Sequence, residues 1–143
     1  MANAHLVETM YAAFASGDIP GVLALLADDI EWHEAEGNKL ADRSPYVGPQ
    51  AVLEGVFERL AEDFEEFAVE IDTILEQGDL VVTQGRYRAK ARGSGVTINP
   101  KIASFWTVRD GKIAAFQQHV DTLILSKAIG EPDLSEAVVQ PGA

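Results

Sequence analysis

The spacing of apolar residues changes once along the chain, and this change limits the possible folds more than any other feature. In the first part, apolar residues recur every three or four positions, which is the period of an amphipathic helix. One such row is Leu6, Val7, Met10, Tyr11 and Phe14. In the second part, longer apolar runs are separated by short turns that contain glycine; they span residues 67–75, 80–92, 96–109 and 113–123. The pattern therefore predicts helices followed by strands, an α+β domain.

Three helices and one short strand are predicted before residue 67. Asp18 can cap the second helix. The third helix begins at Gly48-Pro49, and its apolar stripe is Val52, Leu53, Val56, Phe57, Leu60, Phe64 and Phe67. Between these two helices, Ile30, Trp32 and Glu34 alternate with Glu31 and His33, which is typical of a short strand.

The four later runs predict an antiparallel meander. Asp110-Gly111 lies between two of them, and glycine tolerates the positive φ that a hairpin turn requires. Pro100 cannot donate a ladder hydrogen bond, so we expect a bulge or an edge position within the third run. Because the helices can cover only one face of a long curved sheet, the concave side is expected to form a cone with an apolar throat.

Length and charge limit the domain count and the partners. The 143 residues favour one domain, which we place at residues 1–130, followed by a tail at 131–143. With 11 basic and 23 acidic residues the net charge is −12, which would repel nucleic acid. The chain has no cysteine, which excludes disulfides and cysteine-based metal sites. No apolar run approaches the roughly 20 residues of a membrane span, and no Lys or Arg precedes Lys39, so we expect a cytoplasmic protein without a membrane partner.

Five segments, in their order and spacing, resemble a known family. They are Gly17-Asp18-Ile19 with Leu26-Ala27-Asp28-Asp29-Ile30-Glu31-Trp32, Tyr46-Val47-Gly48-Pro49, Gly85-Arg86-Tyr87, residues 106–113 and residues 116–122. Over roughly residues 3–127 the chain resembles the SnoaL-like and ketosteroid-isomerase-like branch of the nuclear-transport-factor-2-like (NTF2-like) superfamily. The resemblance implies an NTF2-like cone, with three N-terminal helices packed on a curved, mostly antiparallel sheet. The superfamily contains isomerases, polyketide cyclases, epoxide hydrolases, dehydratases and non-catalytic binders, so the resemblance implies no single reaction.

Glu34 is the first candidate catalytic residue. If Ile30 and Trp32 point into the cone, strand alternation directs Glu34 inward as well. A carboxylate beside an indole and aliphatic walls is desolvated, which raises its pKa and makes it a better base near neutral pH. The resemblance agrees. When positions are counted without gaps from the matching segment Gly17-Asp18-Ile19, the general-base aspartate of ketosteroid isomerases falls on Glu34. The alternative is a carboxylate at the rim of a charged loop.

His119 and Asp121 form a second candidate catalytic pair. Residues two apart on a strand share a face, so the imidazole and the carboxylate are predicted to lie side by side. Either group could then transfer a proton. The resemblance supports a role, since SnoaL-type cyclases have an acid/base aspartate on the last strand. The alternative is a structural pair at the end of the strand, with Asp121 capping the C-terminal turn.

The same alternation of side chains along the strand predicts which further residues lie on each face of the sheet. Gln117 would share the inner face with His119 and contact a substrate, whereas Phe116 and Val120 would point to the outer face. Apolar residues on an outer face need cover, and a homodimer through the outer face of the sheet would supply it, as would the C-terminal segment. Dimerisation is also a habit of the family that the chain resembles.

Four aromatic residues, Trp32, Tyr87, Phe105 and Trp106, supply surface that could bind a flat substrate, and Trp32, Tyr87 and Trp106 are the candidate substrate-binding residues among them. The alternative is that they are ordinary core residues. The catalytic tyrosine of ketosteroid isomerases falls on Met10, and a thioether cannot donate the hydrogen bond that an oxyanion hole requires. Tyr11 lies about 100° around the helix, on a different face.

No metal site and no cofactor are predicted, because the chain has neither an H-E-x-x-H motif nor a P-loop. Gly93-Ser94-Gly95 is a turn and not a dinucleotide-binding motif.

Two functions follow from these residues. The first is a cofactor-free acid/base enzyme of isomerase, cyclase or hydrolase type, which acts on a small hydrophobic carbonyl or polyketide-like compound. Glu34 or Asp121 would be its base, and His119 its proton donor or an electrophile. The second is a non-catalytic ligand-binding or dimeric assembly module, which the mismatch at Met10 favours.

Overall fold

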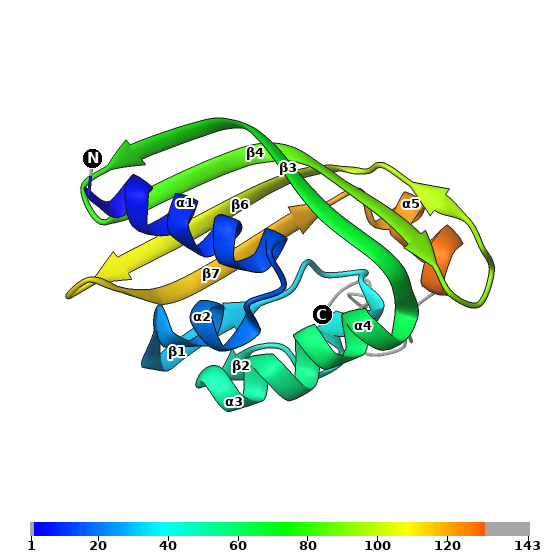
Figure 1. The fold of residues 1–143 in the computed structure, drawn as a ribbon, viewed down its shortest axis with the longest axis horizontal. Coiled ribbons are helices and arrows are strands. Elements are labelled where there is room, and N and C mark those ends of the chain that lie inside the picture. The colour runs from blue at the N-terminus through cyan, green and yellow to red at the C-terminus, as the bar shows by residue number, and fades with distance from the viewer. Residues whose placement is uncertain (1, 131–143) are drawn as a thin grey trace, which may run out of the picture.

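The computed structural model describes residues 2–130, and the predicted tail at 131–143 lies outside them (Figure 1). The helices are α1 (Ala2–Ala15), α2 (Ile19–Ala24), a 3-10 helix (Lys39–Arg43), α3 (Pro49–Val52), a π-helical turn (Leu53–Phe57), α4 (Glu58–Asp63) and α5 (Thr122–Ile129). The strands are β1 (Leu26–His33), β2 (Tyr46–Val47), β3 (Phe64–Gln77), β4 (Leu80–Ala91), β5 (Thr97–Ile98), β6 (Lys101–Arg109) and β7 (Lys112–Val120).

Within residues 2–130, seven strands form one sheet in the order β2-β1-β7-β6-β4-β3, and β5 pairs with β4. All neighbours are antiparallel except β1 and β7, which are parallel. The predicted α+β class and the meander of the last long strands are therefore confirmed. The predicted interruption at Pro100 is also confirmed, since this residue lies between β5 and β6.

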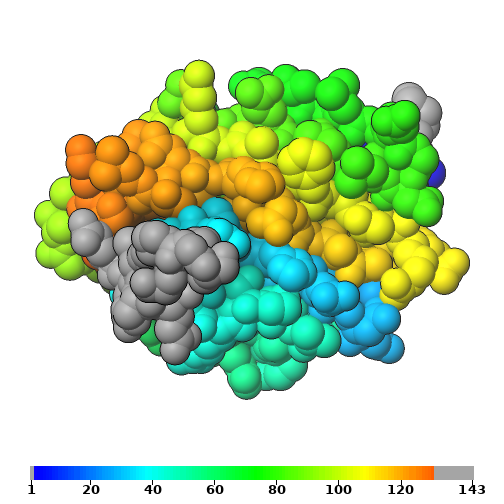
Figure 2. All heavy atoms as spheres, turned by 180° about the vertical axis from the view of Figure 1, so that it is seen from behind, coloured from blue at the N-terminus to red at the C-terminus, as the bar shows by residue number. Residues whose placement is uncertain are grey.

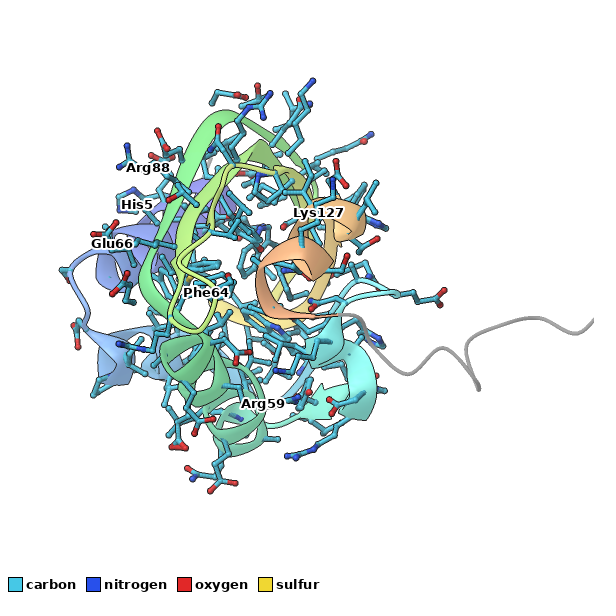
Figure 3. The ribbon with its side chains drawn as sticks, turned by 90° about the vertical axis from the view of Figure 1, so that its right-hand side faces the viewer. His5, Arg59, Phe64, Glu66, Arg88 and Lys127 are labelled. Atoms are coloured by element: carbon cyan, nitrogen blue, oxygen red, sulfur yellow. The ribbon has the colours of Figure 1, made fainter. Side chains whose placement is uncertain are left out.

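The sheet curves around an interior that the helices close on one side (Figures 1 and 3). Helix α1 crosses the concave face, and α3 and α4 run below it, whereas α5 lies at one end of the molecule. Phe64 lies inside this ring of strands and helices, while Glu66 and Arg88 lie on its outside (Figure 3). Side chains alternate along β4 and β6, so that one face of each strand is buried and the other is exposed.

The second helix begins as predicted, and the third differs at its end. The Asp18 side chain accepts a hydrogen bond from the Gly21 N–H at 3.0 Å and caps α2. The third helix ends at Asp63, before the expected residue 67, because the chain continues as β3 from Phe64. The last long strand also ends earlier than expected, at Val120, where α5 follows.

A β-bulge in β7 reverses the side-chain direction over its second half. Ile113 pairs with Val108, but Ala115 pairs with Thr107, so Ala114 is an extra residue opposite one step of β6. Ile113 is buried in the core. Without the bulge, alternation from Ile113 would direct residues 115, 117 and 119 inward; with it, Phe116 and Gln118 face inward.

We predict that Gly85→Ala lowers the free energy of unfolding by about 2 kcal/mol or more, measured by urea denaturation. A Cβ atom at this position would lie 1.9 Å from the carbonyl oxygen of Glu70 on the neighbouring strand β3, so the backbone would have to move. Gly93→Ala is the matched control, because a Cβ there meets nothing within 4 Å. Equal urea midpoints for the two variants would contradict the close approach of β3 and β4.

Candidate functional site

A cavity of about 60 Å³ lies on the concave side of the sheet, between the sheet, α1, α4 and α5. Its walls are mostly apolar, with aliphatic and aromatic side chains from helices and strands. Its polar lining comes from six side chains: Tyr11, Glu34, Asn38, Tyr87, Ser104 and Gln118. A mostly apolar cavity with a few converging polar groups is the usual form of a small-molecule site.

Four of the seven predicted site residues line this cavity, namely Trp32, Glu34, Tyr87 and Trp106. The Trp32 ring packs against Phe116 with ring centroids 3.9 Å apart, and its centroid lies 5.9 Å from that of Trp106. The positions of Trp32 and Glu34 agree with the strand alternation from which they were predicted, whereas Tyr87 and Trp106 were proposed only as aromatic surface. The catalytic and substrate-binding roles of these residues stay predictions.

Gln117 and His119 do not face the cavity, and the prediction that they do is wrong. They line a neighbouring open groove, together with His33 and Thr122, and Glu34 lines both this groove and the cavity. The imidazole of His119 contacts the exposed ring of Phe105 on the outer face of the sheet, with centroids 5.6 Å apart. The cause is the bulge in β7, which directs their inward neighbours Phe116 and Gln118 into the cavity instead.

Asp121 does not line the cavity either. Its carboxylate accepts a hydrogen bond from the Ile124 N–H at 3.3 Å and caps α5. This is the structural alternative that the sequence left open for Asp121. The ground for a dimer also changes, because Phe116 lies in the cavity wall and needs no cover from a second subunit.

Glu34 is buried at the polar end of the cavity and is held by two donors. The indole Nε1 of Trp32 donates to its Oε2 at 2.8 Å, and Nδ2 of Asn38 donates to its Oε1 at 3.0 Å. Only 5% of Glu34 is exposed, and this desolvation raises its pKa from 4.5 to about 7. The hydrogen bonds from Trp32 and Asn38, and the positive charge of Arg59, oppose that rise without cancelling it.

Two amides that were not predicted from the sequence, Asn38 and Gln118, connect Glu34 to the rest of the cavity. Oε1 of Gln118 accepts hydrogen bonds from the Ala35 N–H at 3.1 Å and from Nδ2 of Asn38 at 3.2 Å. Its Nε2 donates to the hydroxyl of Tyr87 at 2.7 Å. Asn38 precedes a 3-10 helix and caps it by accepting from the Leu40 N–H, so a helix-cap signal was present in the sequence. For Gln118 there was no such signal, because its direction depends on the bulge.

Tyr11 was also missed, since it and Met10 both line the cavity although they lie on different faces of α1. The hydroxyl groups of Tyr11 and Thr83 are hydrogen bonded at 2.9 Å, and Nε1 of Trp106 donates to the same Thr83 oxygen at 3.1 Å. Burial raises the pKa of Tyr11 to about 12, so its phenol stays protonated at neutral pH.

Arg59 joins the loop that carries Asn38 to the helical layer. Its guanidinium binds both carboxylate oxygens of Asp42, with distances of 2.8 and 3.1 Å, and donates to the Tyr46 hydroxyl at 3.1 Å. The hydrogen bond from Arg59 lowers the pKa of Asp42. The loop is therefore fixed at both ends, by this ion pair and by the contacts of Asn38.

No three histidine, aspartate or glutamate side chains of residues 2–130 come together as a metal ligand set. No helix in this part of the chain is long and apolar enough to cross a membrane.

The comparisons with known proteins agree with this geometry. The family described as the SnoaL-like domain matches residues 7–116. The chain belongs to this family. No curated protein sequence matches the chain.

Solved structures place this SnoaL-like chain in the NTF2-like superfamily. An NTF2-like protein from Burkholderia thailandensis is 32% identical, with a TM-score of 0.83, over 88% of this chain and 95% of that one. The TerC protein, crystallised with polyporic acid, is 25% identical with a TM-score of 0.80, over 90% of this chain and 98% of that one. IdmH from Streptomyces antibioticus, a putative polyketide cyclase, is 22% identical with a TM-score of 0.73, over 88% of this chain and 96% of that one. It shares the fold.

We predict that the stability of the protein falls between pH 4.5 and pH 7 because of Glu34. Its folded-state pKa of about 7 exceeds the ordinary 4.5, so the native state binds more protons than the unfolded state in this window. The free energy of unfolding therefore falls as the pH rises and levels off above 7, by about 3 kcal/mol for this one group.

Urea denaturation of the wild type and Glu34→Gln at pH 5 and pH 8 measures this contribution. The variant cannot ionise, so its unfolding free energy should fall less than that of the wild type between the two pH values. Glu36→Gln, an exposed change in the same loop, should follow the wild type. An equal fall in the wild type and in Glu34→Gln would contradict the assignment.

Proposed function

We propose that this SnoaL-like protein binds a small hydrophobic carbonyl or polyketide-like compound and uses Glu34 as a general base on it. The observation that carries the proposal is a buried carboxyl group at the polar end of an otherwise apolar cavity. Its pKa of about 7 means that a large fraction is ionised at neutral pH while the group remains a strong enough base. The step needs no cofactor.

The reaction class is proton abstraction next to a carbonyl group. An oxygen of Glu34 takes the proton, the C–H bond breaks, and its electron pair moves into the enolate of the ligand. Returning the proton to another carbon gives an isomerisation; attack of the enolate on a second carbonyl carbon gives a cyclisation. Trp32 and Asn38 donate to the carboxylate in its ionised form, and so they position the base.

A similar protein supports an organic ligand for this cavity. TerC, 25% identical to this chain, was crystallised with polyporic acid. The cavity volume of about 60 Å³ is smaller than the roughly 150 Å³ of an engineered cavity that binds benzene. A ring-sized ligand therefore requires lining side chains to move, and Leu60 and Ile129 are lining residues that are only half-buried.

The second candidate is a binding protein without catalytic activity. Two observations favour it. Each oxygen of Glu34 already accepts a hydrogen bond from the protein. His119 and Asp121, the other predicted acid/base groups, do not line the cavity. The two candidates differ in one measurable property, the exchange of ligand protons with solvent.

We predict that the protein accelerates deuterium exchange at the methyl group of acetophenone in D₂O, followed by NMR. Glu34→Gln should slow the catalysed exchange by about 100-fold or more, because it removes the base. His119→Gln is the control and should exchange at the wild-type rate, because His119 does not line the cavity in which the ligand is proposed to bind. Exchange in the wild type no faster than in buffer would favour the binding protein instead.

The proposal includes a homodimer through the outer face of the sheet, on a different ground from the sequence prediction. In the register of the sheet, Leu75 on β3 lies opposite Val82 on β4, which lies opposite Phe105 on β6. Leu75 is 63% exposed and Phe105 39% exposed, so an apolar row crosses three strands on this face. Figure 2 views the molecule from this side, with β3, β4, β6 and β7 next to one another. A second copy would cover the row.

We predict that Phe105→Asp converts the dimer to the 15.4 kDa monomer in sedimentation at micromolar concentration. The buried charge would be costly to desolvate within an apolar interface. Val96→Asp is the matched control, because Val96 has the same 39% exposure but lies outside the row. A wild-type protein that sediments at 15.4 kDa at this concentration would defeat the proposed dimer.

A further inference from the structure

The hydrogen bonds around Gln118 have a fixed direction. A backbone N–H can only donate, so the Gln118 atom that receives the Ala35 N–H must be its oxygen. The other terminal atom is therefore the amide nitrogen, which can only donate, and it lies 2.7 Å from the hydroxyl oxygen of Tyr87. The orientation of the amide thus follows from a neighbour whose role admits no choice.

This direction leaves the Tyr87 hydroxyl proton without an acceptor among residues 2–130. The oxygen of Tyr87 receives the hydrogen bond from Gln118, so its own proton cannot point back along that bond. No hydrogen bond from this hydroxyl to another described residue is present. Tyr87 lines the cavity and is buried, and its desolvation keeps the phenol protonated. Tyr87 is therefore a hydrogen-bond donor toward the cavity.

Ser104 supplies a second, independent observation. It is only 1% exposed and lines the same cavity, and its hydroxyl makes no hydrogen bond with any residue in the described part of the chain. Thr83, directly opposite on β4, differs in this respect, because its hydroxyl oxygen is occupied by Tyr11 and Trp106. Within residues 2–130 no fully buried side-chain oxygen or nitrogen lacks a partner, so the Ser104 oxygen must keep some accessible surface. Because Ser104 lines the cavity, a ligand in the cavity would be the partner of this hydroxyl.

The two hydroxyl groups flank the same amide. Ser104 on β6 lies directly opposite Gln118 on β7, and residues in this position share a face of the sheet with Cβ atoms about 5 Å apart. Gln118 in turn contacts the Tyr87 hydroxyl and, through Asn38, Glu34. The free donors therefore lie at the polar end of the cavity, beside the proposed base.

We infer that Tyr87 and Ser104 form a binding site for a hydrogen-bond acceptor of the ligand, a carbonyl oxygen or the enolate oxygen derived from it. The inference rests on the proposed function only in requiring that the cavity takes a ligand. It narrows the ligand class to compounds in which an apolar body carries an uncharged acceptor oxygen. Tyr87 and Ser104 would also stabilise the negative charge that forms when Glu34 removes a proton, as an oxyanion hole does.

A matched pair of probes tests the inference, acetophenone and α-methylstyrene, which replaces the carbonyl oxygen by a methylene group of similar shape. Dissociation constants from tryptophan fluorescence give the preference for the ketone over the hydrocarbon. Tyr87→Phe should reduce this preference about five- to tenfold, and Ser104→Ala about two- to fivefold. The infrared carbonyl band of bound ¹³C-labelled acetophenone should shift to higher frequency in both variants, since a lost hydrogen bond strengthens the C=O bond.

Controls separate binding from folding. Tyr46→Phe also removes a buried tyrosine hydroxyl, but Tyr46 lies outside the cavity and donates to the Leu40 carbonyl, so this variant should keep the wild-type preference. Ser104→Ala should not lower the melting temperature, because the hydroxyl that it removes has no partner in the fold. If Tyr87→Phe fails to fold, Ser104→Ala alone decides the question.

Each outcome bears on one proposal or on both. Wild-type preference and carbonyl frequency in Tyr87→Phe and Ser104→Ala would overturn the acceptor site. A carbonyl shift without any proton exchange at acetophenone would uphold the site and overturn the catalytic role of Glu34. If neither probe perturbs the indole NMR signals of Trp32 and Trp106, the cavity takes no such ligand and both proposals fail.

Discussion

One buried carboxyl group and the two donors that hold it determine the structure of the cavity. Trp32 places Glu34 from the end of β1, and Asn38 holds it from the loop that follows. An unpaired charge at this depth would cost several kcal/mol, whereas two charge-assisted hydrogen bonds offset much of that cost. The contacts that hold the loop against Glu34 therefore leave this residue with a pKa of about 7, so that it can gain or lose a proton at neutral pH.

Gln118 extends this arrangement across the sheet and joins polar groups that line the cavity. It receives hydrogen bonds from the loop and donates to Tyr87, so the polar groups of β1, β4 and β7 form one connected set. The other lining side chains are mostly apolar. Such walls would hold the body of a ligand through buried apolar area rather than through directed hydrogen bonds. This arrangement favours a ligand with one polar end, which Glu34 and the hydroxyl groups would meet together.

Sequence reasoning succeeded where local alternation continued undisturbed and failed where one residue interrupted it. From Trp32 to Glu34 the chain alternates regularly, so the burial of both residues could be predicted. In β7 the bulge at Ala114 lies within a run of small and apolar residues, and no glycine or proline marks it. Every side chain after it, His119 included, was therefore assigned to the wrong face. The fold class did not depend on this detail, because helix caps and hairpin turns are encoded locally.

Burial raises the pKa of Glu34 to about 7, and the hydrogen bonds from Trp32 and Asn38 oppose this rise. The most direct measurement is the pH dependence of the ¹³Cδ chemical shift of Glu34 by NMR. The account predicts a midpoint at about pH 7, with the indole Nε1 proton of Trp32 shifting at the same pH because it is hydrogen bonded to the titrating group. A midpoint near 4.5, the ordinary value for glutamate, would contradict the account.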